Sequence, residues 1–446
     1  MIRRPALLAP LAALLLGPVP ALTPTPARAG DGPPPVAATR AELKQFLEDS
    51  KHNRPRLPLP ALTPDEQAKA DRGDWTVVNN ARMRRAYLPT EIATSGFLKF
   101  ADPTITLDYP FQTMLFWVVS RCNNCTYCMG HQESKLAAAG LDDARIAGLD
   151  HDWSRFTPRE RAALAFARKL TLTPQEVAPA DVAKLRESYN DSEITQIILF
   201  VANFNAMNRW TGALKIPQED HRAYLTPTAD ADRDAVSAVA PLDGGRPANG
   251  LACAAPARRP ALETPAEVDR ALAAARARTP LLPLADPSAA RAVAGTEADP
   301  ASPPQWVRLL ALFPDAGGAR IKLVRATATA GALDAKLRAE VAYTAARRDR
   351  AWYALGHARR RLADLGLAPA QVEALDGPLD AFPPAEAAVL ALARKLTTDP
   401  ALVDDADVAA VRAHLDAKQV AEVVHQVAEA AFFDRLTEAA GLRLEE

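Results

Sequence analysis

Three of the four cysteines of this chain lie close together, just before a histidine. They occur in the run Arg121-Cys122-Asn123-Asn124-Cys125-Thr126-Tyr127-Cys128-Met129-Gly130-His131. Two thiols at C-x-x-C spacing, here Cys125 and Cys128, can close a small disulfide, exchange it with another dithiol or bind a soft metal. A nearby imidazole such as that of His131 can move the proton that thiolate chemistry requires. The segment therefore predicts thiol redox chemistry or a metal site.

A helix is predicted on each side of Asn123-Asn124. Apolar residues recur at helical spacing after Pro110, at Phe111, Leu115, Val118 and Cys122. Asn124 is then expected to cap a second helix that begins at Cys125, whose first turn would favour thiolate over thiol. At about 100° per residue, Cys125, Cys128 and Gln132 share one face, and His131 lies about 60° beyond Cys128, within reach of its sulfur.

The sequence repeats itself at a shift of 226 positions, which carries Asp150 to Pro174 onto Asp376 to Pro400 without a gap. The same shift sets Cys125 and Cys128 on Ala351 and Ala354, so the second copy lacks both thiols. It keeps His357, and Glu340 lies eleven positions before Ala351. The expected organisation is a first copy at 39–225, a linker rich in Ala, Asp, Pro and Gly at 226–261, and a second copy at 262–446.

Both copies have the pattern of helical domains. Helix starts are indicated by Thr157-Pro158 with Glu160, by Asp191-Ser192-Glu193, and by Pro383-Pro384 before Glu386. No hairpin signal or strand alternation competes with these patterns. We therefore expect an all-α protein.

The first 29 residues have the pattern of an export signal. Met1-Ile2-Arg3-Arg4 is a basic start to a mostly apolar stretch, and Ala27-Arg28-Ala29 has the small-x-small pattern of a cleavage site. We expect a periplasmic or secreted protein with no membrane contact after cleavage. A formal net charge of −1 offers no basic surface to nucleic acid. Exported compartments are usually oxidising, so the cysteines would rest as a disulfide unless a reductant reaches them.

The segment from Val119 to Cys128, followed by His131, resembles the core motif of the carboxymuconolactone decarboxylase and AhpD-like alkylhydroperoxidase superfamily, whose members carry C-x-Y-C before one or two histidines. The resemblance covers about residues 90–175 and, in the second copy, 320–400. In redox members, it implies, the second cysteine (Cys128 here) attacks hydroperoxide and the first (Cys125) resolves it as a disulfide. A histidine and an upstream glutamate relay the proton.

Two positions depart from the family pattern. The relay histidine often lies four residues after the second cysteine, where this chain has Gln132, and His131 is the substitute found in other members. The relay glutamate would fall at Thr113, beside Gln112. Gln132, Thr113, Cys122 and the motif residue Tyr127 are therefore auxiliary candidates. Dithiol exchange depends on the missing relay less than peroxidase activity does.

Other interpretations of the cysteines stay open at this point. They can be small buried residues, or Cys125, Cys128 and His131 can be three zinc ligands, although no fourth is evident. Cys122 fits a core position, and Cys253 in the linker has no evident role. The chain can also be a non-catalytic, redox-sensitive or protein-binding module, or a lactone decarboxylase, which would need cationic groups for a carboxylate and no cysteines.

The leading expectation is an exported thiol-dependent peroxidase or disulfide oxidoreductase. Its substrate would be a hydroperoxide or a disulfide, and an unidentified dithiol would reduce the oxidised enzyme. No cofactor or metal is expected. Isolated domains of the family commonly form oligomers, which leaves a homo-oligomer open for this chain.

Overall fold

The computed structural model describes residues 36–94, 102–225, 228–237, 239, 261–295 and 302–445. Helices joined by short turns make up this part of the chain, and it contains no β-strand, only an isolated bridge between Thr39 and Val236. The all-α class is confirmed. The predicted export signal, Cys253 and most of the predicted linker lie outside the described residues.

The helices of the first half are α1 (Arg40–Asp49), η1 (Ser50–His52), α2 (Pro64–Ala70), η2 (Trp75–Val77), α3 (Asn79–Tyr87), α4 (Tyr109–Cys122), α5 (Thr126–Ala138), α6 (Asp143–His151), η3 (Trp153–Arg155), α7 (Pro158–Leu172), η4 (Pro174–Glu176), α8 (Pro179–Arg186), α9 (Asp191–Ala213) and α10 (Asp230–Arg233). Those of the second half are α11 (Pro265–Arg276), α12 (Pro287–Ala294), α13 (Gln305–Leu310), α14 (Pro314–Thr327), α15 (Ala335–Asp349), α16 (Trp352–Asp364), α17 (Pro369–Ala374), α18 (Pro384–Thr398), η5 (Pro400–Leu402), α19 (Asp405–Arg412) and α20 (Ala417–Ala439).

The predicted helix starts agree with the structure to within one residue. Thr157 and Glu160 form the reciprocal capping box that opens α7 at Pro158. Asn190 caps α9 at Asp191, and α18 begins at Pro384. Short polar caps and N-terminal prolines thus fix these boundaries locally.

The start of α5 differs from the prediction by one residue. Asn124 has a left-handed backbone (φ 49°), a conformation that asparagine tolerates better than most residues, and it turns the chain out of α4. Cys125 is therefore the N-cap, and its Sγ accepts a hydrogen bond of 3.4 Å from the backbone N–H of Cys128. The prediction that Asn124 caps α5 is therefore wrong. A cysteine sulfur occupies the position where helix dipole and free N–H groups act together.

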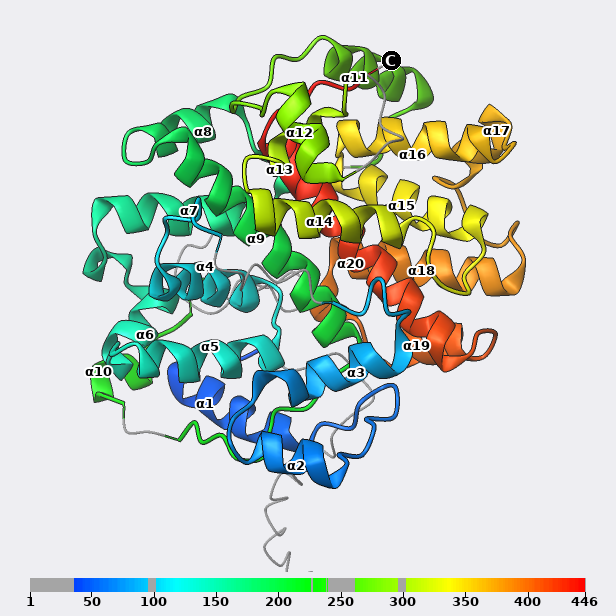
Figure 1. Cartoon of the computed structure of the whole chain (residues 1–446). Helices are drawn as coiled ribbons and strands as arrows, with labels where there is room; N and C mark the ends of the chain where they lie inside the picture. The colour runs from blue at the N-terminus through cyan, green and yellow to red at the C-terminus, as the bar shows by residue number, and fades with distance from the viewer. Residues whose placement is uncertain are drawn as a thin grey trace, which may run out of the picture. The chain divides into compact units, whose positions relative to one another are not determined.

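Helix boundaries in the two halves recur at the spacing of the sequence repeat. A shift of 226 positions carries α5 (Thr126–Ala138) onto α16 (Trp352–Asp364), and in the same way α7, α8 and α9 onto α18, α19 and α20. Figure 1 shows α9 and α20 crossing the middle of the helical assembly, with α4 to α7 on one side and α15 to α18 on the other.

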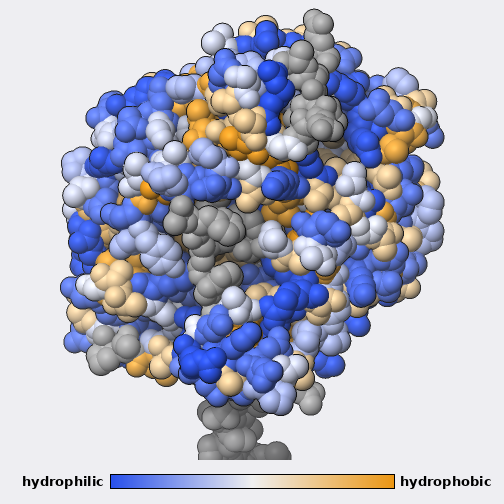
Figure 2. All heavy atoms as spheres, viewed as in Figure 1, coloured by the Kyte–Doolittle hydropathy of each residue, from blue (hydrophilic) through white to orange (hydrophobic). Residues whose placement is uncertain are grey.

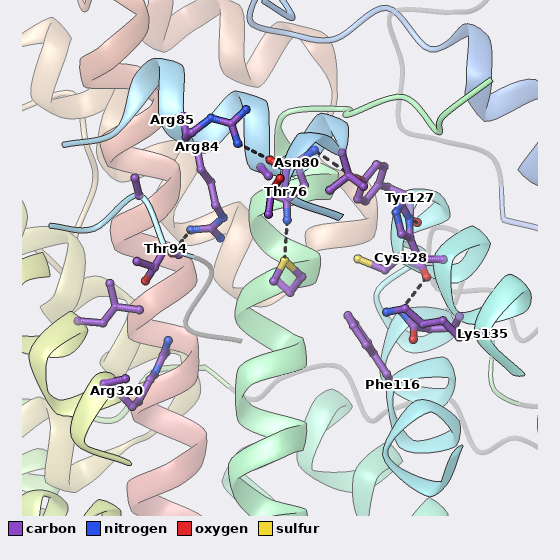
Figure 3. Close-up of a pocket in the computed structure, with 18 of the residues that line it drawn as sticks. Thr76, Asn80, Arg84, Arg85, Thr94, Phe116, Tyr127, Cys128, Lys135 and Arg320 are labelled. Atoms are coloured by element: carbon purple, nitrogen blue, oxygen red, sulfur yellow. Dashed lines mark hydrogen bonds between the residues drawn. The ribbon is translucent and has the colours of Figure 1, made fainter. Parts of the chain in front are cut away.

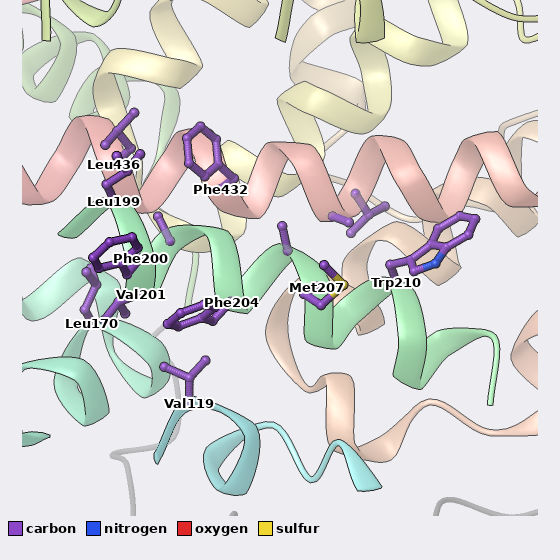
Figure 4. Packing of buried hydrophobic residues seen from close by; sticks show 14 of the residues in the cluster. Val119, Leu170, Leu199, Phe200, Val201, Phe204, Met207, Trp210, Phe432 and Leu436 are labelled. Atoms are coloured by element: carbon purple, nitrogen blue, oxygen red, sulfur yellow. The ribbon is translucent and has the colours of Figure 1, made fainter. Parts of the chain in front are cut away.

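The long helices α9 and α20 pack along each other and form much of the core (Figure 4). Phe200 and Phe204 of α9 face α4 and α7, and the rings of Phe204 and Phe116 stack with centroids 4.0 Å apart. Phe432 of α20 is fully buried on the side of α20 away from α9, where its ring lies under the guanidinium of Arg320. Each such aromatic burial contributes about 2–3 kcal/mol, so the contact of α9 with α4 and α7 holds the site helices in position.

Two arginines join the halves in a reciprocal manner. Arg209 of α9 donates to the carbonyl oxygen of Thr397 (2.9 Å), and Arg435 of α20 donates to that of Thr171 (3.2 Å). Both arginines are almost fully buried. Because these positions also correspond under the shift of 226, the two helix ends contact each other in a nearly symmetric way.

The outer face seen in Figure 2 is mostly hydrophilic, with hydrophobic residues gathered near α12 and α13. Within the described part of the chain, the helices are either too short or too polar to cross a membrane.

Candidate functional site

The cysteines lie where α4 ends and α5 begins. Cys122 closes α4, Cys125 caps α5, and Cys128 lies in the first turn of α5. All three are buried, and Cys125 and Cys128 are free thiols. The turn at Asn123-Asn124 thus brings Cys125 and Cys128 next to each other against α9, as the C-x-x-C spacing predicts.

A single hydroxyl on α9 contacts both thiols of the pair. Thr211 Oγ1 lies 3.0 Å from the Cys125 sulfur and 3.2 Å from the Cys128 sulfur. It also lies 2.9 Å from the carbonyl oxygen of Met207, to which it can donate its one proton. In this orientation it can only accept hydrogen bonds from the thiols, and when it turns away from the Met207 carbonyl it can donate to a thiolate sulfur. Thr211 therefore lies between the two sulfurs and, by turning, can pass a proton between them.

The two thiols have opposite shifts of pKa because they form one coupled pair. Burial disfavours both thiolates, but hydrogen bonds from the Cys128 thiol, from Thr211 and from the Cys128 backbone lower the pKa of Cys125. Burial, together with the neighbouring Cys125, raises the pKa of Cys128 well above the ordinary value. The first negative charge of the pair is thus held at the helix cap, and Cys128 keeps its proton until that proton can move to Cys125.

His131 is paired with a glutamate that lies beyond α9. Its Nε2 atom is 3.2 Å from Oε2 of Glu219, and its Nδ1 atom is 3.1 Å from the carbonyl oxygen of Tyr127. The Tyr127 hydroxyl donates to Oε1 of Glu219 (3.0 Å), and the backbone N–H of Asn79 donates to the same oxygen (3.0 Å). Hydrogen bonds join Tyr127 to both His131 and Glu219, and His131 and Glu219 lie at ion-pair distance; we call the three residues the Tyr-Glu-His set.

Burial lowers the pKa of His131 to about 3, so the imidazole is neutral at pH 7. A neutral imidazole has one N–H, yet two acceptors face it, the Tyr127 carbonyl and the Glu219 carboxylate. A proton that reaches His131 during a reaction would complete the second hydrogen bond. The set is therefore arranged to receive a proton for a short time rather than to hold one.

The Cys128 sulfur has no described hydrogen bond to His131, which the helical spacing predicts to lie within its reach. Among the described residues the hydrogen-bond partners of that sulfur come from α5 and α9, while the imidazole turns toward Glu219. The reason is that Glu219 offers a charged acceptor in a buried setting, which a neutral thiol cannot match. The described residues also contain no group of three His, Cys, Asp or Glu side chains arranged to hold a metal ion.

Of the auxiliary residues predicted from the sequence, some lie at the site and others lie away from it. Gln132 is buried, and its amide donates to the Cys128 carbonyl (3.2 Å). Thr113 lies further back on α4 and donates to the carbonyl oxygen of Tyr109 (2.8 Å). Cys122 is in the core. Thr113 and Cys122 do not line the cavity described next, whereas Gln132 and Tyr127 do.

A cavity of about 770 Å³ opens onto Cys128. Its wall includes Cys128 and His131 from α5 and Phe116 from α4, while α14 of the second half contributes residues such as Arg320 and Leu323. In Figure 3 the sulfur of Cys128 points into the space between these elements. Cys125 is not part of the wall, so a ligand in the cavity would meet Cys128 first.

Glu219 and Thr211 were missed from the sequence, although the repeat contains a signal for Glu219. A shift of 226 carries Tyr127, His131 and Glu219 onto Tyr353, His357 and Glu445. In the structure His357 Nε2 is 3.2 Å from Oε2 of Glu445, and the Tyr353 hydroxyl donates to Oε1 of Glu445 (3.0 Å). A Tyr-Glu-His set thus occurs in both halves, but thiols accompany only the first. Glu340 pairs with Lys336 (2.6 Å) instead of His357.

A glycine in each half permits these sets to form. A Cβ on Gly130 would lie 2.3 Å from the side chain of Gln218, which donates to the carbonyls of Thr126 and Tyr127. A Cβ on Gly356 would lie 2.4 Å from Leu444. The segment that carries the glutamate can approach the helix only where the side chain is absent.

Comparisons with known proteins match parts of this chain. No family model matches it. The uncharacterized protein YdfG of Bacillus subtilis is 30% identical over 95 residues, which are 20% of this chain and 64% of the length of YdfG. The matched segment thus spans less than two thirds of that relative.

Two solved structures are similar to parts of the chain. One is an uncharacterized peroxidase-related protein from Silicibacter (24% identity, 37% of this chain, 91% of the other, TM-score 0.31). The second, from Ralstonia eutropha, is described as an alkylhydroperoxidase AhpD core and an uncharacterized peroxidase-related protein (23% identity, 39% of this chain, 98% of the other, TM-score 0.33). The function of this chain is therefore argued below from its own site.

Proposed function

We propose that this protein is a thiol-dependent peroxidase that reduces organic hydroperoxides with the Cys125–Cys128 dithiol. One observation carries the proposal: Cys128 faces a cavity large enough for an organic molecule, while Cys125 lies directly behind it. A buried dithiol with only one sulfur open to a ligand suits attack by that sulfur and resolution by the other.

The reaction begins with a proton transfer inside the pair. Cys128 passes its proton toward Cys125, by the direct contact or through Thr211, and the resulting thiolate attacks the outer oxygen of the hydroperoxide. A sulfur–oxygen bond forms, the oxygen–oxygen bond breaks, and the alkoxide leaves. His131 lines the same cavity as Cys128 and passes a proton from water to the alkoxide, which leaves as an alcohol. Cys128 is oxidised to a sulfenic acid.

Resolution follows without movement of the backbone over a long distance. The Cys125 sulfur attacks the Cys128 sulfur, a disulfide forms, and the hydroxyl leaves as water after taking a proton. Each turnover thus consumes one hydroperoxide and two thiols. An external dithiol then exchanges with the disulfide and restores the pair.

In this proposal the second half forms part of the cavity wall and supports the helices of the first half. We propose that residues 39–225 and 262–446 are two copies of one helical domain, which the recurring helix boundaries and the two Tyr-Glu-His sets support. Ala351 and Ala354 leave the second copy without a dithiol. Its contribution to the reaction is the face of α14 that closes the cavity.

The test is oxidation of the reduced full chain by one equivalent of cumene hydroperoxide, followed by mass spectrometry of each cysteine. We expect a Cys125–Cys128 disulfide in the wild type, a sulfenic acid on Cys128 that dimedone traps in Cys125→Ser, and no rapid oxidation in Cys128→Ser. Cys122→Ala is the control and should oxidise like the wild type.

Two other results would overturn the proposal. Slow oxidation by peroxide with fast exchange against dithiols would identify a disulfide oxidoreductase. Thiols that react with neither would leave a non-catalytic protein, or a lactone decarboxylase whose turnover persists in the Cys125→Ser/Cys128→Ser double variant.

A further inference from the structure

Two buried arginines share the cavity with Cys128. Arg84 on α3 is 3% exposed and Arg320 on α14 is 1% exposed, and both are part of the cavity wall. Figure 3 shows both arginines on the side of the cavity away from Cys128. A buried cation requires a reason, because its transfer from water is costly unless a partner compensates the charge.

Arg84 forms no ion pair among the described residues, and only the more distant Glu429, which is paired with Arg320, offsets part of its charge. Its Nη1 atom donates to the carbonyl oxygen of Thr94 (3.0 Å), and its guanidinium lies 4.6 Å from the ring centroid of Trp210. Its Nε atom has no hydrogen-bond partner, and the guanidinium forms no ion pair with a described carboxylate. Burial lowers the pKa of Arg84 to about 10, so it is still charged at pH 7.

Arg320 uses the one buried carboxylate nearby. Its Nη2 atom lies 2.6 Å from Oε2 of Glu429, and its guanidinium lies 3.5 Å from the ring centroid of Phe432. His425 adds no charge, because burial and the two arginines hold its pKa well below the ordinary value. Glu91 also lines the cavity, but it is exposed, and water screens its charge. This end of the cavity thus has two buried cations and one buried anion.

The wall between the arginines and the thiol is largely apolar. Val78, Phe116, Met207 and Leu323 are among the residues that form it. The cavity therefore has two buried cations at one end, Cys128 with the half-buried Lys135 at the other, and apolar side chains in its wall, all within about 770 Å³. That volume is typical of a site that encloses an organic ligand.

We propose that the cavity binds an organic hydroperoxide that carries a carboxylate, with the carboxylate at Arg84 and Arg320 and the hydroperoxide at Cys128. This inference rests on the proposed peroxidase function and names its substrate class. A carboxylate restores charge balance at the buried end, and a guanidinium can bind it through two parallel hydrogen bonds. The anchored acid then holds the reactive group against the sulfur. The reaction follows the steps above, with the hydroxy acid as product and an external dithiol as reductant.

Binding is measured first because it does not depend on turnover. Decanoate and decanol have the same chain length, but only decanoate is charged at pH 7. By isothermal titration of the reduced full chain we expect saturable binding of decanoate, at least tenfold tighter than that of decanol. Arg84→Gln should remove most of this preference. Arg85→Gln is the matched control, because Arg85 also lines the cavity but pairs with Glu66 (2.9 Å) at the surface.

Oxidation is measured second, with a straight-chain hydroperoxy acid and its methyl ester. The acid should have a KM at least tenfold lower than the ester in the wild type, and Arg84→Gln should make the two similar while Arg85→Gln should not. If Arg84→Gln does not fold, the comparison of acid and ester in the wild type still tests whether the cavity prefers a carboxylate. Arg84→Lys then replaces it as the variant, because lysine keeps the charge but cannot bind a carboxylate through two parallel hydrogen bonds.

The outcomes separate the two proposals. Equal binding and equal KM for acid and ester, with rapid oxidation of Cys128, would overturn the carboxylate site and leave the peroxidase. Tight binding of decanoate that persists in Cys128→Ser, with no oxidation of Cys128 by either hydroperoxide, would overturn the peroxidase and the substrate class with it.

Discussion

The carboxylate of Glu219 lies 3.2 Å from the imidazole of His131. His131 belongs to the cysteine motif, whereas Glu219 lies in a segment after α9 that the motif does not include. Glu445 and His357 have the same relation in the second half, at the same distance of 3.2 Å. The resemblance of the cysteine motif implies a glutamate upstream of the cysteines, at the position where this chain has Thr113. Glu219 supplies a carboxylate to the histidine from the opposite direction along the chain.

Glu219→Gln should slow the oxidation of Cys128 by hydroperoxide about tenfold to a hundredfold. The amide cannot stabilise a proton on His131, and a positioned acid–base group typically contributes a factor in the hundreds or more. Stopped-flow measurement of thiol loss in the reduced protein would give the rate.

The second half supplies the control for this variant. Glu445 accepts from the Tyr353 hydroxyl and from the backbone N–H of Gln305, as Glu219 does from Tyr127 and Asn79. Glu445→Gln should therefore destabilise the fold by a similar amount and leave the oxidation rate unchanged. Equal slowing in both variants would mean that the carboxylate acts only on the fold.

Thr211→Val should raise the pH at which the dithiol reacts by about half to one pH unit. The hydroxyl lowers the pKa of both Cys125 and Cys128, and one hydrogen bond is worth about 1 kcal/mol. The rate of alkylation by iodoacetamide, followed from pH 5 to 10, would show the shift.

Thr437→Val is the matched variant in the second half. Thr437 donates to the carbonyl oxygen of Phe433 (2.8 Å), just as Thr211 donates to that of Met207, but the positions that match Cys125 and Cys128 in this half are Ala351 and Ala354. It should leave the alkylation profile as in the wild type. A profile that Thr211→Val does not move would exclude the hydroxyl from the thiol equilibrium.

The wild-type protein should lose stability as the pH rises from about 5 to 8, and Glu340→Gln should remove this loss. Burial, with Glu386 close by, raises the pKa of Glu340 from 4.5 to about 7. The folded state therefore binds this proton more tightly than the unfolded state, so the wild type is favoured below pH 4.5 and loses stability as the pH rises through 7. The difference should be about 1–2 kcal/mol, because Lys336 and solvent screen part of the charge.

Urea unfolding at pH 5 and pH 8 would measure this effect. Glu373→Gln, which changes an exposed carboxylate of α17 in the same half, should keep the pH dependence of the wild type. A Glu340→Gln protein with unaltered pH dependence would show that Glu340 is charged at pH 7.

Arg435→Met should destabilise the protein by about 3–5 kcal/mol, because it leaves the carboxylate of Asp349 buried without its cation. The two groups are 2.7 Å apart, and neither side chain is exposed. Asp349→Asn in the same chain should recover at least half of the loss, since it imitates Asn123 at the corresponding position of the first half. Urea unfolding of the single and double variants measures the coupling energy between Arg435 and Asp349. If the losses of the two single variants simply added in the double variant, the predicted coupling would be wrong.

The helices were predictable because their signals are local. The capping box at Thr157, the prolines at Pro158 and Pro384, and the apolar spacing from Phe111 to Cys122 each act within one or two turns. The exception at Asn124 also has a local cause. The left-handed backbone there moved the helix start to Thr126 and made the Cys125 sulfur the cap.

Sequence patterns were enough to predict the all-helical class, the adjacent pair Cys125 and Cys128, and the repeat at a shift of 226 positions. Those features depend on residues a few positions apart or on a comparison of the chain with itself. The folded structure was needed to show that Thr211 contacts both sulfurs, that Glu219 lies beside the imidazole, and that Arg84 and Arg320 share one end of the cavity. These residues come from helices and segments far apart in the chain, and side-chain packing between α9, α14 and α20 sets which of them meet.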